Sequence, residues 1–239
     1  MMKVQVPMWS TAGDAELQFY REMGVEYISV MFHENDWDYE SVSRLQERMA
    51  KFDLKITDAG SFSVFKNPII HLGLDGRDEQ IDRYNRFTTV MGQCKIPICS
   101  LAWQPDGAVR SYKRVGQYTR GSVSGIVDMT EIEKRELSHG RIYSEEEIWD
   151  NFKYFLDRTL PVCEKAGVKM ALHPNDPPTA CVMGVSSLIY NSEGFKRAFE
   201  LAGNSPYLGM KLCVGCWLEA GDAFGNLMED IRYFVELGK

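Results

Sequence analysis

Short runs rich in β-branched and aromatic residues alternate with longer amphipathic stretches along this 239-residue chain, and this alternation constrains the fold more than any other feature. The runs that predict strands are Val4–Trp9, Tyr27–Phe32, Lys55–Ala59, Ile96–Trp103, Val168–His173 and Tyr207–Cys213. The stretches that predict helices are Asp14–Met23, Tyr39–Lys51, Asp78–Met91, Glu145–Ala166 and Asn226–Leu237. Near-continuous apolar strands separated by helices predict an α/β domain whose parallel sheet is buried on both faces.

The stretch Glu145–Ala166 gives the strongest helix signal. Ser144 precedes it as an expected N-cap, and Glu147 follows three residues later, as in a capping box. Pro161 lies inside the stretch, where a proline can kink a helix. Aromatic residues at helical spacing are expected to lie in the core, and these are Trp149, Phe152 and Phe155.

Two architectures fit this pattern, a doubly wound open sheet and a (β/α)₈ barrel. The segment after the first strand reads PMWSTAGD and lacks a Gly-rich dinucleotide fingerprint, which disfavours the dinucleotide-binding form of the open sheet. Polar residues follow the ends of most strands, as in the active site of a barrel. These residues are His33, Asp58, Gln104, His173 and Cys213. We therefore predict a (β/α)₈ barrel.

The chain supplies six strand–helix units, whereas a complete barrel has about eight. We interpret residues 1–239 as a single partial barrel domain that lacks the last two βα units. Two long insertions, at about 105–143 and 174–191, follow the fourth and fifth strands. Long loops on this face of a barrel are usually functional.

The overall charge argues against a nucleic-acid or membrane partner. The chain has 27 Lys and Arg residues against 34 Asp and Glu residues, a net charge of −7. No apolar run approaches the roughly 18 residues of a membrane helix, and the N-terminal sequence lacks the apolar region of a signal peptide. The six cysteines are too sparse for a disulfide scaffold, so we expect a cytoplasmic protein.

A histidine closes the fifth predicted strand in the segment His173-Pro-Asn-Asp-Pro-Pro. Each proline restricts its own backbone and that of the preceding residue, so the turn holds His173 in place. A metal ligand or an acid–base group needs such fixation. A histidine that merely ends a strand before a rigid turn fits the same pattern.

The sixth predicted strand brings a lysine and a cysteine to one face, because alternate side chains share a face. Lys211 shares its face with Cys213, and a buried lysine needs a partner for its charge. We expect this polar face to point into the barrel. Neighbouring parallel strands lie about 4.8 Å apart, so His173 and Cys213 are candidate ligands of one divalent transition-metal ion.

Cys213 and Cys216 also form a Cys-x-x-Cys motif, which leaves two other readings open. A redox pair of the thioredoxin type normally precedes a helix in a much smaller domain. Half of a zinc site requires a second Cys or His pair at ligand spacing, which the sequence lacks. The other four cysteines are expected to be buried apolar residues.

Several further residues are candidates for contact with the substrate. His33 follows the second strand, where it can act as an acid–base group or be an ordinary loop histidine. Cations in the first insertion suit a carboxylate or phosphate substrate, although a solvated basic loop gives the same composition; they are Arg110, Lys113, Arg114 and Arg120. We take His33, Arg110 and Arg120 as the candidate catalytic residues. His71 and His139 are expected at the surface.

Two of these motifs resemble the mannonate dehydratases, metal-dependent lyases on a xylose-isomerase-like barrel. That family carries His-Pro-Asp-Asp-Pro-Pro after the fifth strand, where this chain has His173 to Pro178. It carries Cys-Thr-Gly-Ser after the next strand, where this chain has Cys213-Val-Gly-Cys216. The order and the spacing agree, and Asn175 and Cys216 are departures from the motifs.

The resemblance implies a metal site and a reaction. His173 and Cys213 would be metal ligands, with Mn²⁺ as the expected ion and Fe²⁺ as the alternative. The family's other ligands, a His and an Asp, come from strands seven and eight, which this chain does not reach. The implied reaction removes water from D-mannonate, a sugar acid, to give 2-dehydro-3-deoxy-D-gluconate.

Two alternatives to a lyase remain open. One is a sugar isomerase or epimerase on the same kind of barrel, and the other is an inactive homologue that binds a sugar acid or a partner chain. An incomplete barrel leaves unpaired edge strands, which favour association, so we expect a homo-oligomer, most simply a dimer.

Overall fold

Six parallel strands form the central sheet of the computed structural model, which describes residues 3–116 and 119–239. Adjacent strands in the sheet follow the order of the chain. They are β1 (Gln5–Trp9), β2 (Tyr27–Met31), β3 (Lys55–Gly60), β4 (Ile98–Ala102), β7 (Lys169–His173) and β10 (Leu208–Met210). Each pair of neighbours is parallel. The predicted parallel α/β sheet is confirmed.

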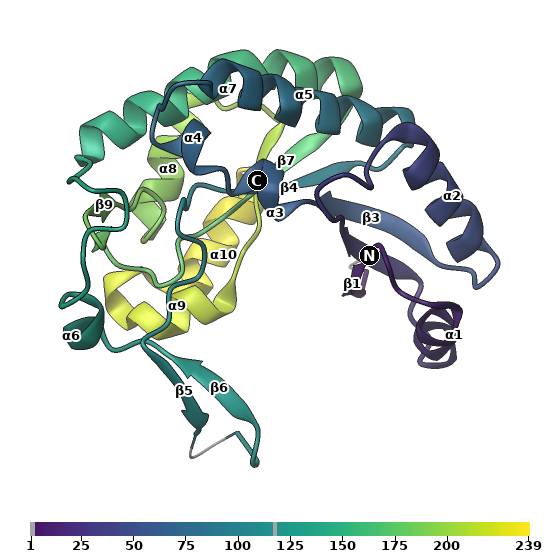
Figure 1. The fold of residues 1–239 in the computed structure, drawn as a ribbon, viewed down its shortest axis with the longest axis horizontal. Helices are drawn as coiled ribbons and strands as arrows, with labels where there is room; N and C mark the ends of the chain where they lie inside the picture. Colours follow the sequence, from purple (N-terminus) through teal and green to yellow (C-terminus); the bar gives the residue numbers. More distant parts are fainter. Residues whose placement is uncertain (1–2, 117–118) are drawn as a thin grey trace.

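One main helix follows each strand of the sheet in sequence. They are α1 (Asp14–Glu22), α2 (Tyr39–Ala50), α5 (Arg77–Gln93), α7 (Glu145–Ala166), α8 (Ser192–Leu201) and α10 (Leu227–Glu236). Figure 1 shows α1, α2, α5 and α7 along the outer arc of the molecule, with the strands converging inside it. This arrangement of strands within an outer layer of helices is that of a (β/α) barrel.

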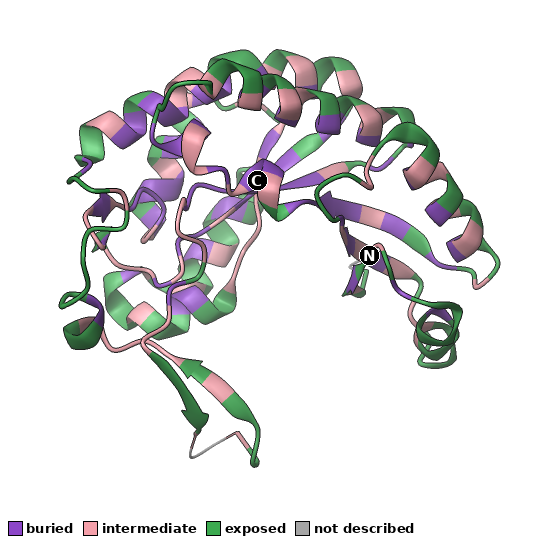
Figure 2. Ribbon diagram, in the orientation of Figure 1, coloured by how far each residue is buried: buried purple, intermediate pink, exposed green. Residues whose placement is uncertain are grey.

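The burial of the two faces of the sheet differs from strand to strand. In β2, Ile28 and Val30 are fully buried, whereas Tyr27, Ser29 and Met31 between them are only half-buried. Figure 2 shows buried residues concentrated where helices meet strands. In β4, by contrast, Cys99 to Ala102 are all buried, so residues of both faces are covered there. The prediction that both faces are buried is therefore confirmed in β4 and wrong in β2, because β1 and β10 each pair with one neighbour and the described sheet does not close.

The longest helix, α7, agrees with the prediction from the sequence. The Ser144 hydroxyl accepts a hydrogen bond from the Glu147 backbone N–H at 3.2 Å. The helix continues through Pro161 to Ala166. Its three predicted core aromatics, Trp149, Phe152 and Phe155, are buried.

The structure adds elements that the sequence interpretation missed. They are α3 (Phe62–Phe65), α4 (Pro68–His71), β5 (Tyr112–Val115), β6 (Val123–Ile126), α6 (Met129–Ile132), β8 (Cys181–Val182), β9 (Val185–Ser186), α9 (Val214–Ala220) and the 3₁₀ turn Gly221–Ala223, together with α8. The last strand stops at Met210 instead of Cys213, because Cys213 is the N-cap of α9. Both insertions therefore contain short regular elements.

Among the described residues, no helix combines the length and the apolar character needed to cross a membrane.

Candidate active site

An ion pair lies on the inner face of the sheet. The Lys211 ammonium Nζ is 2.8 Å from Asp58 Oδ2 and 3.1 Å from Ser100 Oγ. The Ser29 and Ser100 hydroxyls donate to the same carboxylate at 2.8 and 3.2 Å. Residues of β2 and β4 and the residue that follows β10 thus provide partners for the buried carboxylate of Asp58 in β3. This confirms that Lys211 faces the inside and is paired.

His173 ends β7 at the carboxyl edge of the sheet, and its imidazole is held in one orientation. Its Nδ1 lies 2.6 Å from the Pro174 carbonyl oxygen, which can only accept, so Nδ1 carries the hydrogen. Burial lowers the pKa of His173, and the nearby Lys66 and Lys211 charges act in the same direction. The neutral ring therefore keeps a lone pair on Nε2, which is the form that binds a metal ion.

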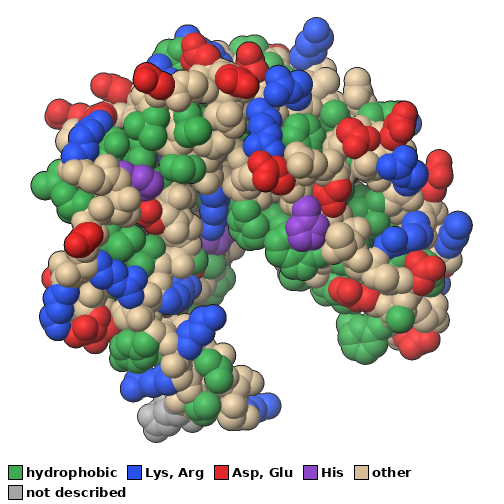
Figure 3. Space-filling model, in the orientation of Figure 1, with side chains coloured by type: hydrophobic (Ala, Val, Ile, Leu, Met, Phe, Trp, Pro, Cys, Tyr) green, Lys and Arg blue, Asp and Glu red, His purple; other side chains and the backbone are tan. Residues whose placement is uncertain are grey.

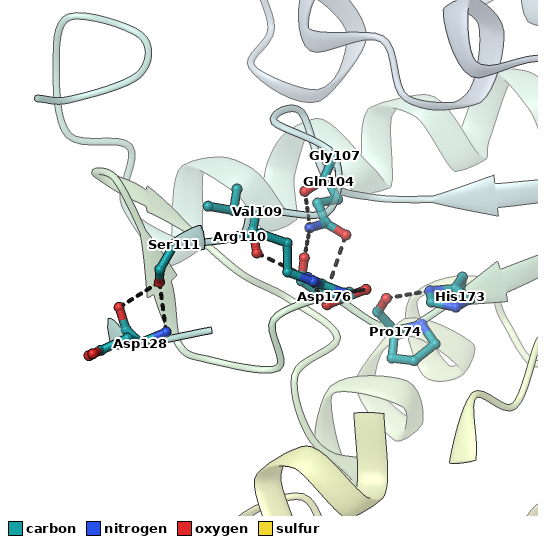
Figure 4. Close-up of polar contacts among 9 residues, drawn as sticks. All are labelled: Gln104, Gly107, Val109, Arg110, Ser111, Asp128, His173, Pro174 and Asp176. Carbon is teal, nitrogen blue, oxygen red and sulfur yellow. Dashed lines mark hydrogen bonds and ion pairs between the residues drawn. The ribbon is translucent and has the colours of Figure 1, made fainter. Parts of the chain in front are cut away.

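The turn after His173 is tied to its neighbours by side-chain amides. Asn175 donates to the Trp103 carbonyl at 3.1 Å and accepts from the Ile189 backbone N–H at 2.8 Å. Gln104 accepts from the Asp176 backbone N–H at 3.1 Å and donates back to the Asp176 carbonyl. The loop after β4 and the turn after β7 thus form one rigid unit, as Figure 4 shows.

Arg110 extends this unit with a bidentate ion pair. Its Nη1 and Nη2 lie 2.6 and 2.8 Å from Oδ1 and Oδ2 of Asp176. The hydrogen bonds that Arg110 donates to the Asp176 carboxylate raise the pKa of Arg110. Figure 4 shows the guanidinium directed at Asp176, close to the His173 turn. The structure thus brings Arg110 to the site, with its charge already partnered.

Lys66 is a site residue that the sequence interpretation missed. It directly follows α3, and burial lowers the pKa of its ammonium, with Arg110 acting in the same direction and Asp176 against it. Lys66 also lowers the pKa of His173. The signal in the sequence was a lysine between Phe65 and Asn67 in the loop after a barrel strand, where functional residues gather.

Cys213 lies next to His173 in the topology of the sheet. Met210 is in register with Leu172, and the Lys211 backbone N–H donates to the Leu172 carbonyl at 2.8 Å. Residue 211 is therefore level with residue 173, and Cys213 follows two positions later, at the start of α9. Cys213 is half-buried, whereas Cys216 is buried.

These two residues form at most half of a metal site. Within residues 3–116 and 119–239, no three His, Cys, Asp or Glu side chains are grouped so that they could hold a metal ion. The donor chemistry of the pair itself suits a divalent transition metal, since His173 presents a neutral Nε2 and Cys213 a thiol. The described residues fit such an ion as two of its ligands.

His33 lies at the mouth of the barrel in an aromatic cluster. Its ring stacks on Trp9 with centroids 4.8 Å apart and planes 14° apart, and the Phe62 ring lies 6.0 Å from that of Trp9. Trp9 is 45% exposed and Phe62 46%. Figure 3 shows His and hydrophobic side chains on one flank of a hollow, and Lys and Arg side chains on the other.

Arg120 is not brought to this site. It lies in the connection between β5 and β6, is exposed, and adopts a positive φ of 50°. Lys113 and Arg114 are exposed on β5 of the same hairpin, which projects from the body of the molecule in Figure 1. A cavity of about 500 Å³ lies at the base of this hairpin and is lined by Arg110, Pro177 and Glu219, among others.

The expectations for three other residues were wrong. His71 is 1% exposed, not at the surface, because α4 packs it against Trp103 with ring centroids 4.3 Å apart. His139 is half-buried, with Nε2 3.0 Å from Asp106 Oδ1. Cys181, expected to be buried like Cys94, Cys99 and Cys163, is exposed on the short β8.

Comparison with known proteins finds similarity to the mannonate dehydratases. The family model D-mannonate dehydratase (UxuA) matches residues 126–237. A mannonate dehydratase of Thermotoga maritima is 28% identical over 235 residues, which cover 85% of this chain and 63% of that protein. The structure of mannonate dehydratase from Streptococcus suis serotype 2 superposes with a TM-score of 0.81 at 26% identity, over 100% of this chain and 71% of that one. Over most of its length, this chain is similar in sequence and structure to mannonate dehydratases.

The same comparisons support the predicted barrel type. A xylose isomerase domain protein from Planctomyces limnophilus matches with a TM-score of 0.58 at 12% identity, over 99% of this chain and 71% of its own. At that identity the match concerns the fold alone, and it confirms the xylose-isomerase-like barrel. The chain spans 63% of the length of the Thermotoga mannonate dehydratase.

Proposed function

We propose that this chain carries a metal-dependent hydro-lyase site that dehydrates D-mannonate to 2-dehydro-3-deoxy-D-gluconate. The observation that carries the proposal is the pairing of a neutral imidazole at the end of β7 with a thiol that begins α9, next along the sheet. The similarity to mannonate dehydratases supports the choice of substrate.

In this proposal, His173 and Cys213 hold a divalent cation, Mn²⁺ or alternatively Fe²⁺, together with ligands from outside the described residues. A bound cation would stabilise the negative charge that develops when the C2 proton leaves. A site that needs a free thiol works best in a reducing compartment, so we propose the cytoplasm as its location.

The protein groups around the pair have separate tasks. The half-buried Lys66 ammonium suits the substrate carboxylate, because a partly desolvated cation attracts an anion more strongly than an exposed one. The exposed faces of Trp9 and Phe62 suit the apolar C–H face of the sugar chain. In this proposal, His33, which stacks on Trp9, exchanges a proton with the substrate, as a base at C2 or as an acid to the leaving C3 hydroxyl.

The test is incubation of the chain with D-mannonate and Mn²⁺, followed by an assay for a 2-keto-3-deoxy acid. The expected result is that product forms with the metal and is absent with a chelator. A ketose or an epimeric sugar in place of the keto acid would assign the alternative isomerase or epimerase activity. No turnover with bound Mn²⁺ would assign an inactive binding homologue.

A further inference from the structure

Cys213 and Cys216 are two thiols in the first turn of one helix, next to the proposed metal site. We propose that they form a reversible intramolecular disulfide, with a peroxide as the oxidant, and that this modification removes the Cys213 sulfur from the metal site. The disulfide itself stands on the local geometry. Its effect on metal binding rests on the proposed function.

The backbone already holds the pair at the spacing that a disulfide needs. The Cys216 backbone N–H donates to the Cys213 carbonyl at 3.0 Å, which closes the turn between them. Residues three apart in a helical turn have Cα atoms about 5 Å apart, and disulfides join Cα atoms usually about 4.4–6.8 Å apart. Side-chain rotation, with little movement of the backbone, can therefore bring the sulfurs together.

Differences in access give the two thiols different roles. Cys213 is half-buried, and Val214 and Gly215 beside it are exposed, so a small oxidant can reach its sulfur from solvent. Cys216 is only 2% exposed, which protects it from direct oxidation. Cys213 is thus the thiol that reacts first, and Cys216 is the one that resolves the product.

The chemistry balances with hydrogen peroxide. The Cys213 thiolate attacks one peroxide oxygen, the O–O bond breaks, and the leaving hydroxide takes a proton to become water. The Cys216 thiol then attacks the Cys213 sulfur, the S–S bond forms, the S–O bond breaks, and a second water leaves. Two thiols are oxidised and one peroxide is reduced. A dithiol reductant reverses the change.

The consequence for the proposed metal site is direct. A metal ion binds the thiolate, and a disulfide sulfur offers no such charge. Oxidation therefore leaves His173 as the one proposed ligand among the described residues.

The experiment compares the unmodified chain with C216S and C181S variants. Serine at position 216 keeps the size and the hydrogen-bonding capacity of cysteine but cannot form a disulfide, and C181S removes the exposed thiol elsewhere. Each reduced protein is treated with hydrogen peroxide, its thiols are alkylated, and its peptides are mapped by mass spectrometry. Mn²⁺ binding is measured by electron paramagnetic resonance before and after treatment.

We expect a Cys213–Cys216 link in the unmodified chain and in C181S, reversed by dithiothreitol and absent from C216S. We also expect oxidation to abolish Mn²⁺ binding in the unmodified chain and dithiothreitol to restore it, whereas in C216S the Cys213 sulfur has no resolving thiol and should be oxidised further to a sulfinic acid that dithiothreitol does not reverse. In the unmodified chain, unlinked thiols, or a sulfinic acid at Cys213 without a link, would overturn the disulfide. Equal Mn²⁺ affinity before and after linkage would overturn its effect on the metal. If the reduced chain bound no Mn²⁺, the proposed function would fail, while peptide mapping would still decide the disulfide.

Discussion

The guanidinium of Arg110 contacts both carboxylate oxygens of Asp176, at 2.6 and 2.8 Å, and so fastens the long insertion after β4 to the proline-rich turn after β7. Both side chains are largely but not fully buried, with 28% and 21% exposed. Asp176 lies three residues after His173, so the pair acts on the site by holding the turn that carries the imidazole.

Breaking this ion pair is expected to loosen the turn. R110A and D176A should each lower activity, and a double-mutant cycle on the free energy of unfolding should show a coupling of about 1 kcal/mol, as for a partly exposed pair. Denaturant unfolding of the four proteins provides the measurement. Additive effects of the two substitutions would show that the contact does not stabilise the turn.

Two substitutions are expected to separate metal binding, which involves His173, from proton transfer, which involves His33. H173A should weaken Mn²⁺ binding by at least about 100-fold, because it removes a direct ligand, and second-shell changes alone cost about 10–100-fold. The matched variant is H33A, which should bind Mn²⁺ normally but turn over more slowly. Calorimetric Mn²⁺ titration of both variants checks this. Normal binding by H173A would exclude His173 as a ligand.

Lys66 is expected to hold the substrate carboxylate. K66M should raise KM for D-mannonate by about tenfold, since a hydrogen bond to a charged group contributes about 1.5–3 kcal/mol, and K66R should stay close to the parent. Burial lowers the pKa of Lys66, so KM should begin to rise at a lower pH than it would if the lysine were exposed. K66R should flatten that rise. Steady-state kinetics across pH decide, and an unchanged KM in K66M would rule this role out.

Acid should destabilise the fold through His71. Burial lowers its pKa from 6.5 to about 3, so below pH 6.5 the unfolded chain binds a proton that the folded chain does not. Stability contributed by this residue is present above pH 6.5 and falls by about 1.4 kcal/mol per pH unit as the pH drops toward 3. H71F, which keeps a ring against Trp103, should show a shallower fall than the parent in unfolding experiments from pH 6 to 4. Parallel curves for the two proteins would refute this role.

Among residues 3–116 and 119–239, β1 and β10 each pair with the sheet on one side only, and their outer edges are expected to drive self-association. Sedimentation velocity at micromolar concentration should show a dimer. A single monomeric species over a hundredfold range of concentration would contradict the expectation.

Much of the scaffold can be predicted from the sequence because its signals are local. The expected strand at Tyr27–Phe32 lies within one residue of β2, and Glu145–Ala166 coincides with α7. Apolar periodicity and an N-cap can both be recognised from residues that are close together in the sequence. The missed helix α8 carries the same kind of signal, with Asn191 as its cap and buried Phe195 and Phe199 on one face.

The site is less predictable because its contacts join distant parts of the chain. His173 and Asn175 could be singled out from one proline-rich segment. The pairing of Arg110 with Asp176 spans 66 residues, and that of Lys211 with Asp58 spans 153. Lys66 and His71 were missed or misplaced because their burial depends on how α3 and α4 fold over the ends of the strands, which the local sequence does not specify.

The contact between Lys211 and Asp58 also sets the alignment of the last strand. β10 has only three residues, so few backbone bonds resist a slip along β7. A shift by one position would turn the ammonium toward the helices and away from its carboxylate, and the sulfur two residues later would turn with it. The Lys211–Asp58 ion pair therefore determines the direction in which the Cys213 side chain points at the edge of the sheet.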